Sequence, residues 1–187
     1  STYDDGGNGV GNYCTLNPLN KDSDTTLSDG NLTATASTDS GVAGTIAMSS
    51  GKWYWENTIS TSSDPAPSLL GVYGVADRAS SYPGQTADSY GYYLTDGNKY
   101  YSNTNASYGD SCTDGDVVGV ALDLDNGNLY FYKNNVVQDS GTAAFTGLTG
   151  SYVPAVSACA NSGATSVHVN FGQRAFAYTP PTGYKAL

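Results

Sequence analysis

The sequence predicts an all-β fold, a sandwich of two antiparallel sheets. Glycine and tyrosine are abundant, with 23 and 16 residues in a chain of 187, and Ser, Thr and Asn are frequent. This composition favours strands and turns over helices. No stretch repeats its apolar positions with the 3.6-residue period of a helix. Turn-forming residues recur roughly every 8–12 residues, as is typical of a sandwich.

The clearest local pattern lies in residues 115–132. Apolar residues alternate with other residues on both sides of Asn126-Gly127. They are Val118, Val120, Leu122 and Leu124 before the turn, and Leu129 and Phe131 after it. Asn-Gly predicts a two-residue type I′ turn, since both central residues of that turn need a positive φ. Asp96-Gly97 predicts a second tight hairpin in the same way.

The same reasoning places ten strands along the chain. We expect them near residues 31–36, 43–48, 52–59, 70–76, 89–94, 98–101, 116–124, 128–133, 152–158 and 165–171. Long polar loops are expected at 60–68, 77–88 and 102–114. Residues 1–11 are rich in glycine and predict a flexible linker segment, which leaves 12–187 as one folded domain.

Charge excludes some classes of partner. The net charge is −10, and only seven residues are Lys or Arg. A nucleic-acid surface needs a basic face, so we expect no nucleic acid as partner. The apolar runs are too short to span a bilayer, so no membrane insertion is expected.

Metal sites and cofactors are not expected either. The spacing of Cys14, Cys112 and Cys159 does not match a metal site. Two alternatives remain open: three buried thiols, or a disulfide between Cys112 and Cys159, each of which adjoins a predicted strand. His168 is the only histidine and is expected to be structural. Residues 123–128 (DLDNGN) superficially match a calcium loop, but the glycine comes one position early, so a hairpin turn is favoured.

A series of short motifs resembles the SPRY domain family. The matching segments, in order, are 51–56 (GKWYWE), 71–76 (GVYGVA), 89–92 (SYGY), 108–110 (YGD), 115–120 (GDVVGV), 152–157 (YVPAVS), 170–176 (NFGQRAF) and 180–184 (PPTGY). The resemblance implies a concanavalin A-like, jelly-roll-like sandwich that binds through loops at one end and has no enzyme activity. It divides the domain into an N-terminal extension, 12–50, and a SPRY core, 51–187.

The N-terminal extension resembles a narrower group. Residues 12–32 and 44–53 look like the start of SPRY-like modules in tailed-phage structural proteins, including tail fibres, and in related marine viral sequences. Because the concanavalin A-like fold also hosts glycosidases, a glycan hydrolase is the least favoured alternative. It needs two carboxylates that face each other across a groove. Glu56 is the only glutamate, and Asp123 and Asp125 flank a tight turn, so we predict no enzyme.

Tyrosine and asparagine are the candidates for binding. Seven tyrosines fall between residues 82 and 108, interleaved with asparagines. Tyrosine gives a large, rigid contact area, and asparagine gives adaptable hydrogen bonds. We expect Tyr90 and Tyr92 to be scaffold. The candidates near loops are Tyr82, Tyr101, Asn103, Asn105 and Tyr108.

The resemblance and these candidates together predict a non-enzymatic binding module of a viral structural protein. In one version, a tail fibre or spike recognises a host-surface glycan or protein through the loops. In the other, the domain decorates a capsid or packs against another virion subunit, and a homo-oligomer is one such assembly. Both versions predict a location on the virion or outside the cell.

Overall fold

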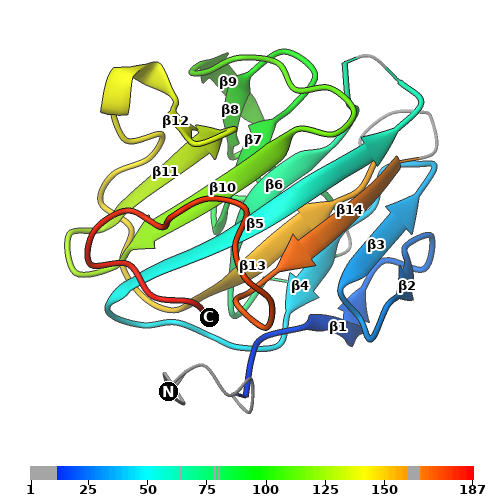
Figure 1. Cartoon of the computed structure of the whole chain (residues 1–187), viewed down its shortest axis with the longest axis horizontal. Coiled ribbons are helices and arrows are strands. Elements are labelled where there is room, and N and C mark those ends of the chain that lie inside the picture. The colour runs from blue at the N-terminus through cyan, green and yellow to red at the C-terminus, as the bar shows by residue number, and fades with distance from the viewer. Residues whose placement is uncertain (1–11, 64, 78, 80, 160–164) are drawn as a thin grey trace.

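The computed structural model describes residues 12–63, 65–77, 79, 81–159 and 165–187. They form two antiparallel seven-stranded sheets packed face to face, so the predicted all-β sandwich is confirmed (Figure 1). The linker predicted for residues 1–11 lies outside the described residues. In the described part of the chain, no helix has the length and apolarity needed to cross a membrane.

The strands of the two sheets follow a spatial order that differs from their order in the chain. Across sheet A lie β1 (Leu16–Lys21), β4 (Val42–Gly44), β13 (Tyr152–Ser157), β6 (Leu69–Gly74), β7 (Ser89–Tyr93), β8 (Asn98–Tyr101) and β9 (Thr104–Ser107). Across sheet B lie β12 (Val136–Val137), β11 (Asn128–Lys133), β10 (Val117–Asp123), β5 (Lys52–Thr61), β14 (Thr165–Asn170), β3 (Thr33–Ala36) and β2 (Thr26–Ser28). A 3₁₀ turn, η1 (Asp139–Gly141), follows β12. The four strands of the N-terminal extension are divided between the sheets: β1 and β4 belong to sheet A, and β2 and β3 belong to sheet B.

The sequence did not predict four of these strands: β1, β2, β9 and β12. All four lie at the margins of the sheets. A marginal strand pairs on one side only and buries little, so its residues need no apolar alternation. Strand β9 (TNAS) is exposed at all four positions, and it replaces part of the loop predicted at 102–114.

The two predicted Gly-containing turns are wider than expected. The loops that join β10 to β11 and β7 to β8 each span four residues. Only the glycine of each pair has a positive φ, 69° at Gly127 and 74° at Gly97. In the first loop, Asp123 Oδ1 accepts the N–H groups of Asp125 and Asn126, both at 3.1 Å. These bonds hold the wide turn, so the two-residue type I′ prediction was wrong.

Two-residue turns of the type I′ kind occur elsewhere. Ser102-Asn103 joins β8 to β9 with φ values of 51° and 57°, and Asn134-Asn135 joins β11 to β12 with 47° and 70°. Asparagine tolerates this left-handed conformation better than most residues. The β8–β9 turn is the one that contributes to the candidate binding site.

The hydrophobic core lies between the sheets. Five residues of the predicted inward face have 0% exposure: Val118, Val120, Leu122, Leu129 and Phe131. The sixth, Leu124, lies after the end of β10 and is half-buried. Tyr92 of β7 stacks on Phe131 with the ring centroids 5.0 Å apart. Tyr92 is therefore scaffold, as expected.

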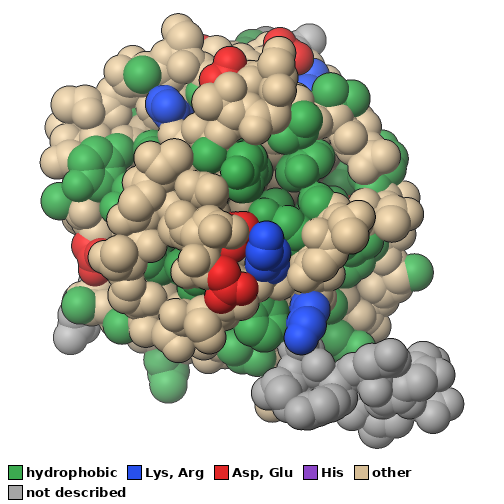
Figure 2. Space-filling model, turned by 90° about the vertical axis from the view of Figure 1, so that its left-hand side faces the viewer, with side chains coloured by type: hydrophobic (Ala, Val, Ile, Leu, Met, Phe, Trp, Pro, Cys, Tyr) green, Lys and Arg blue, Asp and Glu red, His purple; other side chains and the backbone are tan. Residues whose placement is uncertain are grey.

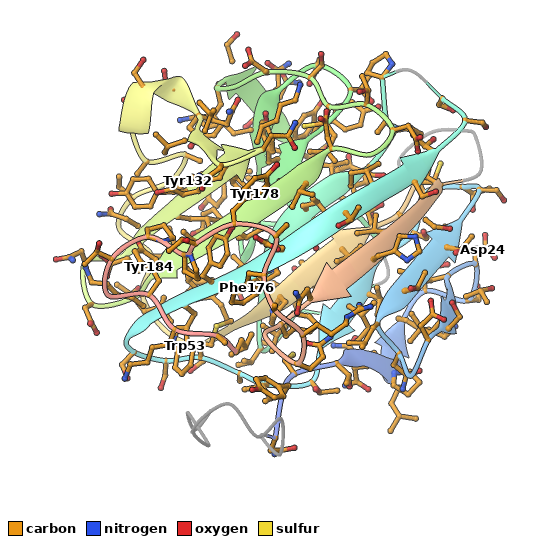
Figure 3. All side chains as sticks on the ribbon, in the orientation of Figure 1. Asp24, Trp53, Tyr132, Phe176, Tyr178 and Tyr184 are labelled. Atoms are coloured by element: carbon orange, nitrogen blue, oxygen red, sulfur yellow. The ribbon has the colours of Figure 1, made fainter. Side chains whose placement is uncertain are left out.

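The C-terminal segment crosses the outer face of sheet B, where Figure 3 labels Phe176, Tyr178 and Tyr184. The buried carboxylate of Glu56 on β5 holds this segment. It accepts the N–H groups of Ala177 at 2.7 Å and Tyr178 at 2.9 Å, and the hydroxyl of Tyr54 at 3.2 Å. The Tyr54 ring also packs edge-on against Phe176 at 5.2 Å. The only glutamate of the chain thus serves as a structural anchor.

The cysteines are free and buried, so the disulfide considered between Cys112 and Cys159 is not formed. The alternative of three buried thiols holds. Cys112 Sγ lies 3.9 Å from the carbonyl oxygen of Asp110, and burial raises the pKa of its thiol to about 12. A buried neutral thiol of this kind packs as a small apolar group.

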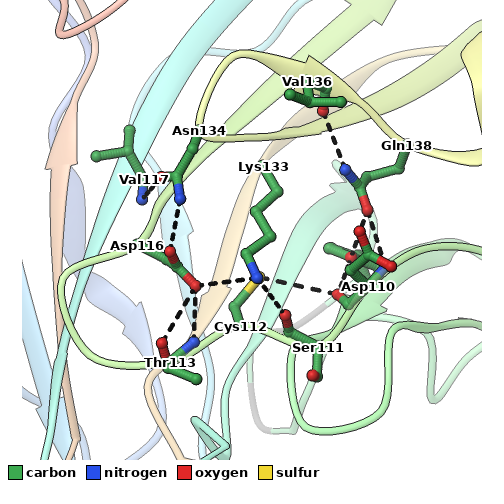
Figure 4. Close-up of polar contacts among 11 residues, drawn as sticks. Asp110, Ser111, Cys112, Thr113, Asp116, Val117, Lys133, Asn134, Val136 and Gln138 are labelled. Atoms are coloured by element: carbon green, nitrogen blue, oxygen red, sulfur yellow. Dashed lines mark hydrogen bonds and ion pairs between the residues drawn. The ribbon is translucent and has the colours of Figure 1, made fainter.

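A polar network fixes the loop before β10 (Figure 4). Asp116 accepts the N–H of Thr113 at 2.8 Å and Nδ2 of Asn134 at 2.6 Å, and its carboxylate lies 3.4 Å from Lys133 Nζ. Lys133 also donates to the carbonyl oxygen of Ser111 at 2.7 Å. The network ties this loop to the β11–β12 hairpin.

A second carboxylate, Asp123, pairs with Lys52 Nζ at 2.9 Å and accepts Nδ2 of Asn126 at 2.8 Å. It lies at the β10–β11 end of the sandwich, which faces the viewer in Figure 2 and carries sparse charged groups. Burial opposes the ionisation of both Asp116 and Asp123. Their hydrogen-bond donors and paired lysines outweigh it, so the pKa of each carboxyl lies below its usual value.

These two carboxylates predict a loss of stability in acid. A lowered pKa in the folded state gives stability that is present above the unfolded pKa of about 3.9 and is lost as the pH falls through the folded value. We expect the urea midpoint to be lower at about pH 3 than at about pH 6. In the double variant Asp116→Asn, Asp123→Asn, that difference should shrink. An unchanged difference would contradict the assignment.

Candidate functional site

Residues 81–84, in the loop between β6 and β7, lie against the outer face of sheet A. The hydroxyl of Tyr73 on β6 donates to the carbonyl oxygen of Ser81. Gly91 of β7 leaves space for the loop: a Cβ there would lie 2.1 Å from the carbonyl oxygen of Pro83. Gly84 packs on Tyr100 of β8 in the same way, since a Cβ there would lie 2.5 Å from the Tyr100 carbonyl oxygen. Both glycines therefore let the loop reach the sheet.

The β8–β9 turn meets this loop through hydrogen bonds. The N–H of Asn103 donates to the carbonyl oxygen of Gly84 at 2.9 Å, and the N–H of Ser102 to that of Thr86 at 3.1 Å. The hydroxyl of Tyr82 donates to Oδ1 of Asn103 at 2.9 Å. The loop and the turn thus fix each other's main chain and side chains.

Four side chains meet here and form what we call the aromatic–amide surface: Tyr82, Tyr100, Asn103 and Asn105. Tyr82 packs edge-on against Tyr100 with the centroids 6.3 Å apart, and Asn105 is the cross-strand partner of Tyr100. Both asparagines are exposed, and both tyrosines are half-buried. The surface offers amide and phenol groups around two rings.

The electrostatic character of the surface is acidic. Burial raises the pKa of Tyr82 and of Tyr100, and the neighbouring carboxylates of Asp39 and Asp96 raise them further. Both phenols are therefore neutral, and they donate or accept hydrogen bonds as uncharged groups. Binding by ring contact and hydrogen bonds fits this arrangement.

The structure brings three of the five predicted binding residues together: Tyr82, Asn103 and Asn105. Tyr101 is 40% exposed but lies on the other face of sheet A, where it stacks on Tyr90 at 5.0 Å. The position of Tyr108 corrects the sequence-based prediction. It lies after the end of β9, is only 6% exposed and packs in the core against Tyr92 and Phe131.

Sequence reasoning missed Tyr100 as a member of the surface. Tyr100 could be recognised only from the pairing of β8 with β9, which places it opposite Asn105. The two-residue turn that joins these strands was not predicted from the sequence.

Other chemical groups have structural partners. His168 Nδ1 lies 2.9 Å from Thr33 Oγ1, and Asp125 accepts the N–H of Gly51 at 2.8 Å. Among the described residues, no three His, Cys, Asp or Glu side chains gather as a metal site would require. The carboxylates considered for hydrolysis, Glu56, Asp123 and Asp125, thus hold main-chain segments and turns.

Comparison with known proteins adds the family. The SPRY domain family matches residues 52–174. The chain belongs to the SPRY domain family. A Drosophila melanogaster protein, "Ran-binding proteins 9/10 homolog", is 32% identical over 134 residues, which cover 71% of this chain and 13% of that protein. The chain therefore spans a small part of that relative's length.

Solved structures with the same fold include two further proteins. The SPRY domain of human HERC1 superposes with a TM-score of 0.68 at 19% identity, covering 82% of this chain and 96% of that one. Stonustoxin superposes with a TM-score of 0.67 at 22% identity, covering 85% of this chain and 27% of that one. At such low identity these likenesses show the fold. SPRY domains are protein-binding modules, and those related to this chain are typically non-catalytic.

Proposed function

We propose that this SPRY domain binds a protein partner through the aromatic–amide surface. The observation that carries the proposal is the docking of the β6–β7 loop on the β8–β9 turn, through the Tyr82–Asn103 bond and two main-chain bonds. These contacts hold the side chains in place before a partner arrives. A contact surface that is already ordered loses less entropy on binding.

The chemistry of the surface limits the partner. Tyrosine rings and exposed amides favour a partner that brings hydrogen-bonding groups and an apolar edge. Asp39 and Asp96 lie close to the two tyrosines, and the chain carries a net charge of −10. A neutral or basic protein segment therefore fits better than an acidic one.

A binding selection tests the proposal. The domain is used to select from a displayed library of random peptides, and the affinity of the recovered peptides is measured for three variants. Tyr82→Ala and Asn103→Ala should each weaken binding at least about tenfold, a loss of about 1.4 kcal/mol. Tyr178→Ala, on the outer face of sheet B, should bind as the wild type does.

The outcomes separate clearly if the melting temperature shows that every variant is folded. Equal affinity in all three variants would refute the assignment to this surface. A glycan array is screened in parallel. Binding to glycans alone, lost in the same two variants, would favour a carbohydrate ligand over a protein.

The narrower prediction, a tail-fibre or spike domain that recognises a host surface, or an architectural virion domain, stays a prediction. So does its location on the virion or outside the cell. The Drosophila relative and human HERC1 are animal proteins. A screen against intact bacterial cells and purified surface polysaccharides would test the receptor version directly.

A further inference from the structure

We infer that the partner binds as an extended segment that pairs with β9 and adds an eighth strand to sheet A. This inference rests on the proposed function, because it names the form that the bound partner takes. Strand β9 ends sheet A and lies at the outer margin of the sandwich (Figure 1). Its residue Asn105 belongs to the aromatic–amide surface.

The four marginal strands differ in how they are protected. Pro18 and Lys21 interrupt β1, whose pairing with β4 is irregular. Strands β2 and β12 are three and two residues long. Proline, charge, irregular register and short length are the usual means by which proteins block an exposed edge. Strand β9 has four residues in regular register, with no proline and no charge.

The hydrogen-bonding pattern of β9 follows from its two-residue turn. In such a hairpin the residues flanking the turn, Tyr101 and Thr104, form a hydrogen-bonded pair, and bonded and non-bonded pairs then alternate. Asn105 and Ser107 therefore occupy non-hydrogen-bonded positions of the ladder with β8. Their N–H and C=O groups point away from β8, toward the free margin. Two donors and two acceptors stand there at the spacing of a strand.

The occupant we assign is an extended peptide segment that is neutral or basic. Main-chain groups at a sheet margin supply affinity, and side chains on the faces supply specificity. On the outer face the added strand would lie beside Asn105, whose partner on β8 is Tyr100, and the carboxylate of Asp96 is close to that tyrosine. A second copy of this chain fits less well, because two copies that each carry a net charge of −10 repel each other.

Amide hydrogen exchange tests strand addition on the wild-type protein. The probe is a peptide of about ten residues recovered from the displayed library, long enough for one strand. On saturation, the amides of Asn105 and Ser107 should exchange at least about tenfold more slowly. The amides of Thr104 and Ala106, which already bond to β8, should change little. Unchanged exchange at Asn105 and Ser107 in the complex would overturn the inference.

A pair of variants at one position gives an independent test. Asn105→Pro removes the outward N–H, which β8 does not use, whereas Asn105→Ala removes only the side chain. We expect the proline variant to bind the peptide at least about tenfold more weakly than the alanine variant. Equal affinities, with both variants folded by melting temperature, would overturn the inference.

The results also separate this inference from the proposed function. If Tyr82→Ala weakens binding while the amides of Asn105 and Ser107 exchange as fast as in the free protein, binding at the aromatic–amide surface is supported and strand addition is refuted. If those amides are protected while Tyr82→Ala and Asn103→Ala bind normally, strand addition is supported and binding at the aromatic–amide surface is refuted. Failure to recover any peptide overturns both, and self-association through β9 in sedimentation would assign the margin to a second copy.

Discussion

Glu56→Ala is expected to lower the free energy of unfolding by about 3 kcal/mol, the range found when a buried charged acceptor is lost. Glu56 is 3% exposed, and its carboxylate accepts three hydrogen bonds. Without it, the N–H groups of Ala177 and Tyr178 lose their acceptor, and the C-terminal segment loses its anchor on β5. Urea denaturation measures the loss, and limited proteolysis should cut the C-terminal segment of the variant first.

Two controls make the Glu56 prediction specific. Glu56→Gln keeps one acceptor oxygen and should recover about half of the loss. Asp39→Ala removes an exposed carboxylate of the same charge, and surface changes of this kind usually stay within about 0.5 kcal/mol. A Glu56→Ala protein as stable as Asp39→Ala would show that the C-terminal segment does not depend on this carboxylate.

Tyr108→Ala is expected to lower the free energy of unfolding by about 4 kcal/mol, as large-to-small changes of buried aromatic residues do. The Tyr108 ring contacts Tyr92 and Phe131 edge-on at 5.8 and 6.1 Å. Its hydroxyl donates to the carbonyl oxygen of Thr142 at 3.3 Å and accepts the N–H of Phe131 at 3.4 Å. Chemical denaturation with matched m-values would measure the change.

Tyr101→Ala is the matched control for Tyr108→Ala. It removes the same side chain from a position that is 40% exposed, so the loss should be about 1 kcal/mol or less. Similar losses in the two variants would contradict the placement of Tyr108 in the core. The comparison also matters for binding studies, because a Tyr108→Ala variant would lose function by unfolding.

The fold was predictable because a strand with one buried face has apolar residues at every second position of its sequence. Val118, Val120 and Leu122 show it plainly, and all three are fully buried. The marginal strands were not predicted because they bury too little to show an apolar alternation. The sequence TNAS of β9 is typical of a loop, and it forms a strand by pairing with β8. The length of the β10–β11 turn was not predicted either, because it depends on hydrogen bonds to the side chain of Asp123.

The site was predictable in part. The concentration of Tyr and Asn between residues 82 and 108 located it, but alternation decides which face each residue takes. Tyr100 and Tyr101 are neighbours that face opposite sides of sheet A. The structural role of Glu56 was not predictable, because its partner Ala177 lies 121 residues away in the sequence.

The central claim is that the aromatic–amide surface holds the partner. Nuclear magnetic resonance tests it most directly, by mapping the amide shifts of the isotope-labelled domain as a selected peptide is added. We predict that the perturbed amides cluster in residues 82–86 and 98–107, at the loop and the β8–β9 hairpin. Perturbations confined to the outer face of sheet B, around His168 and the C-terminal segment, would contradict the claim.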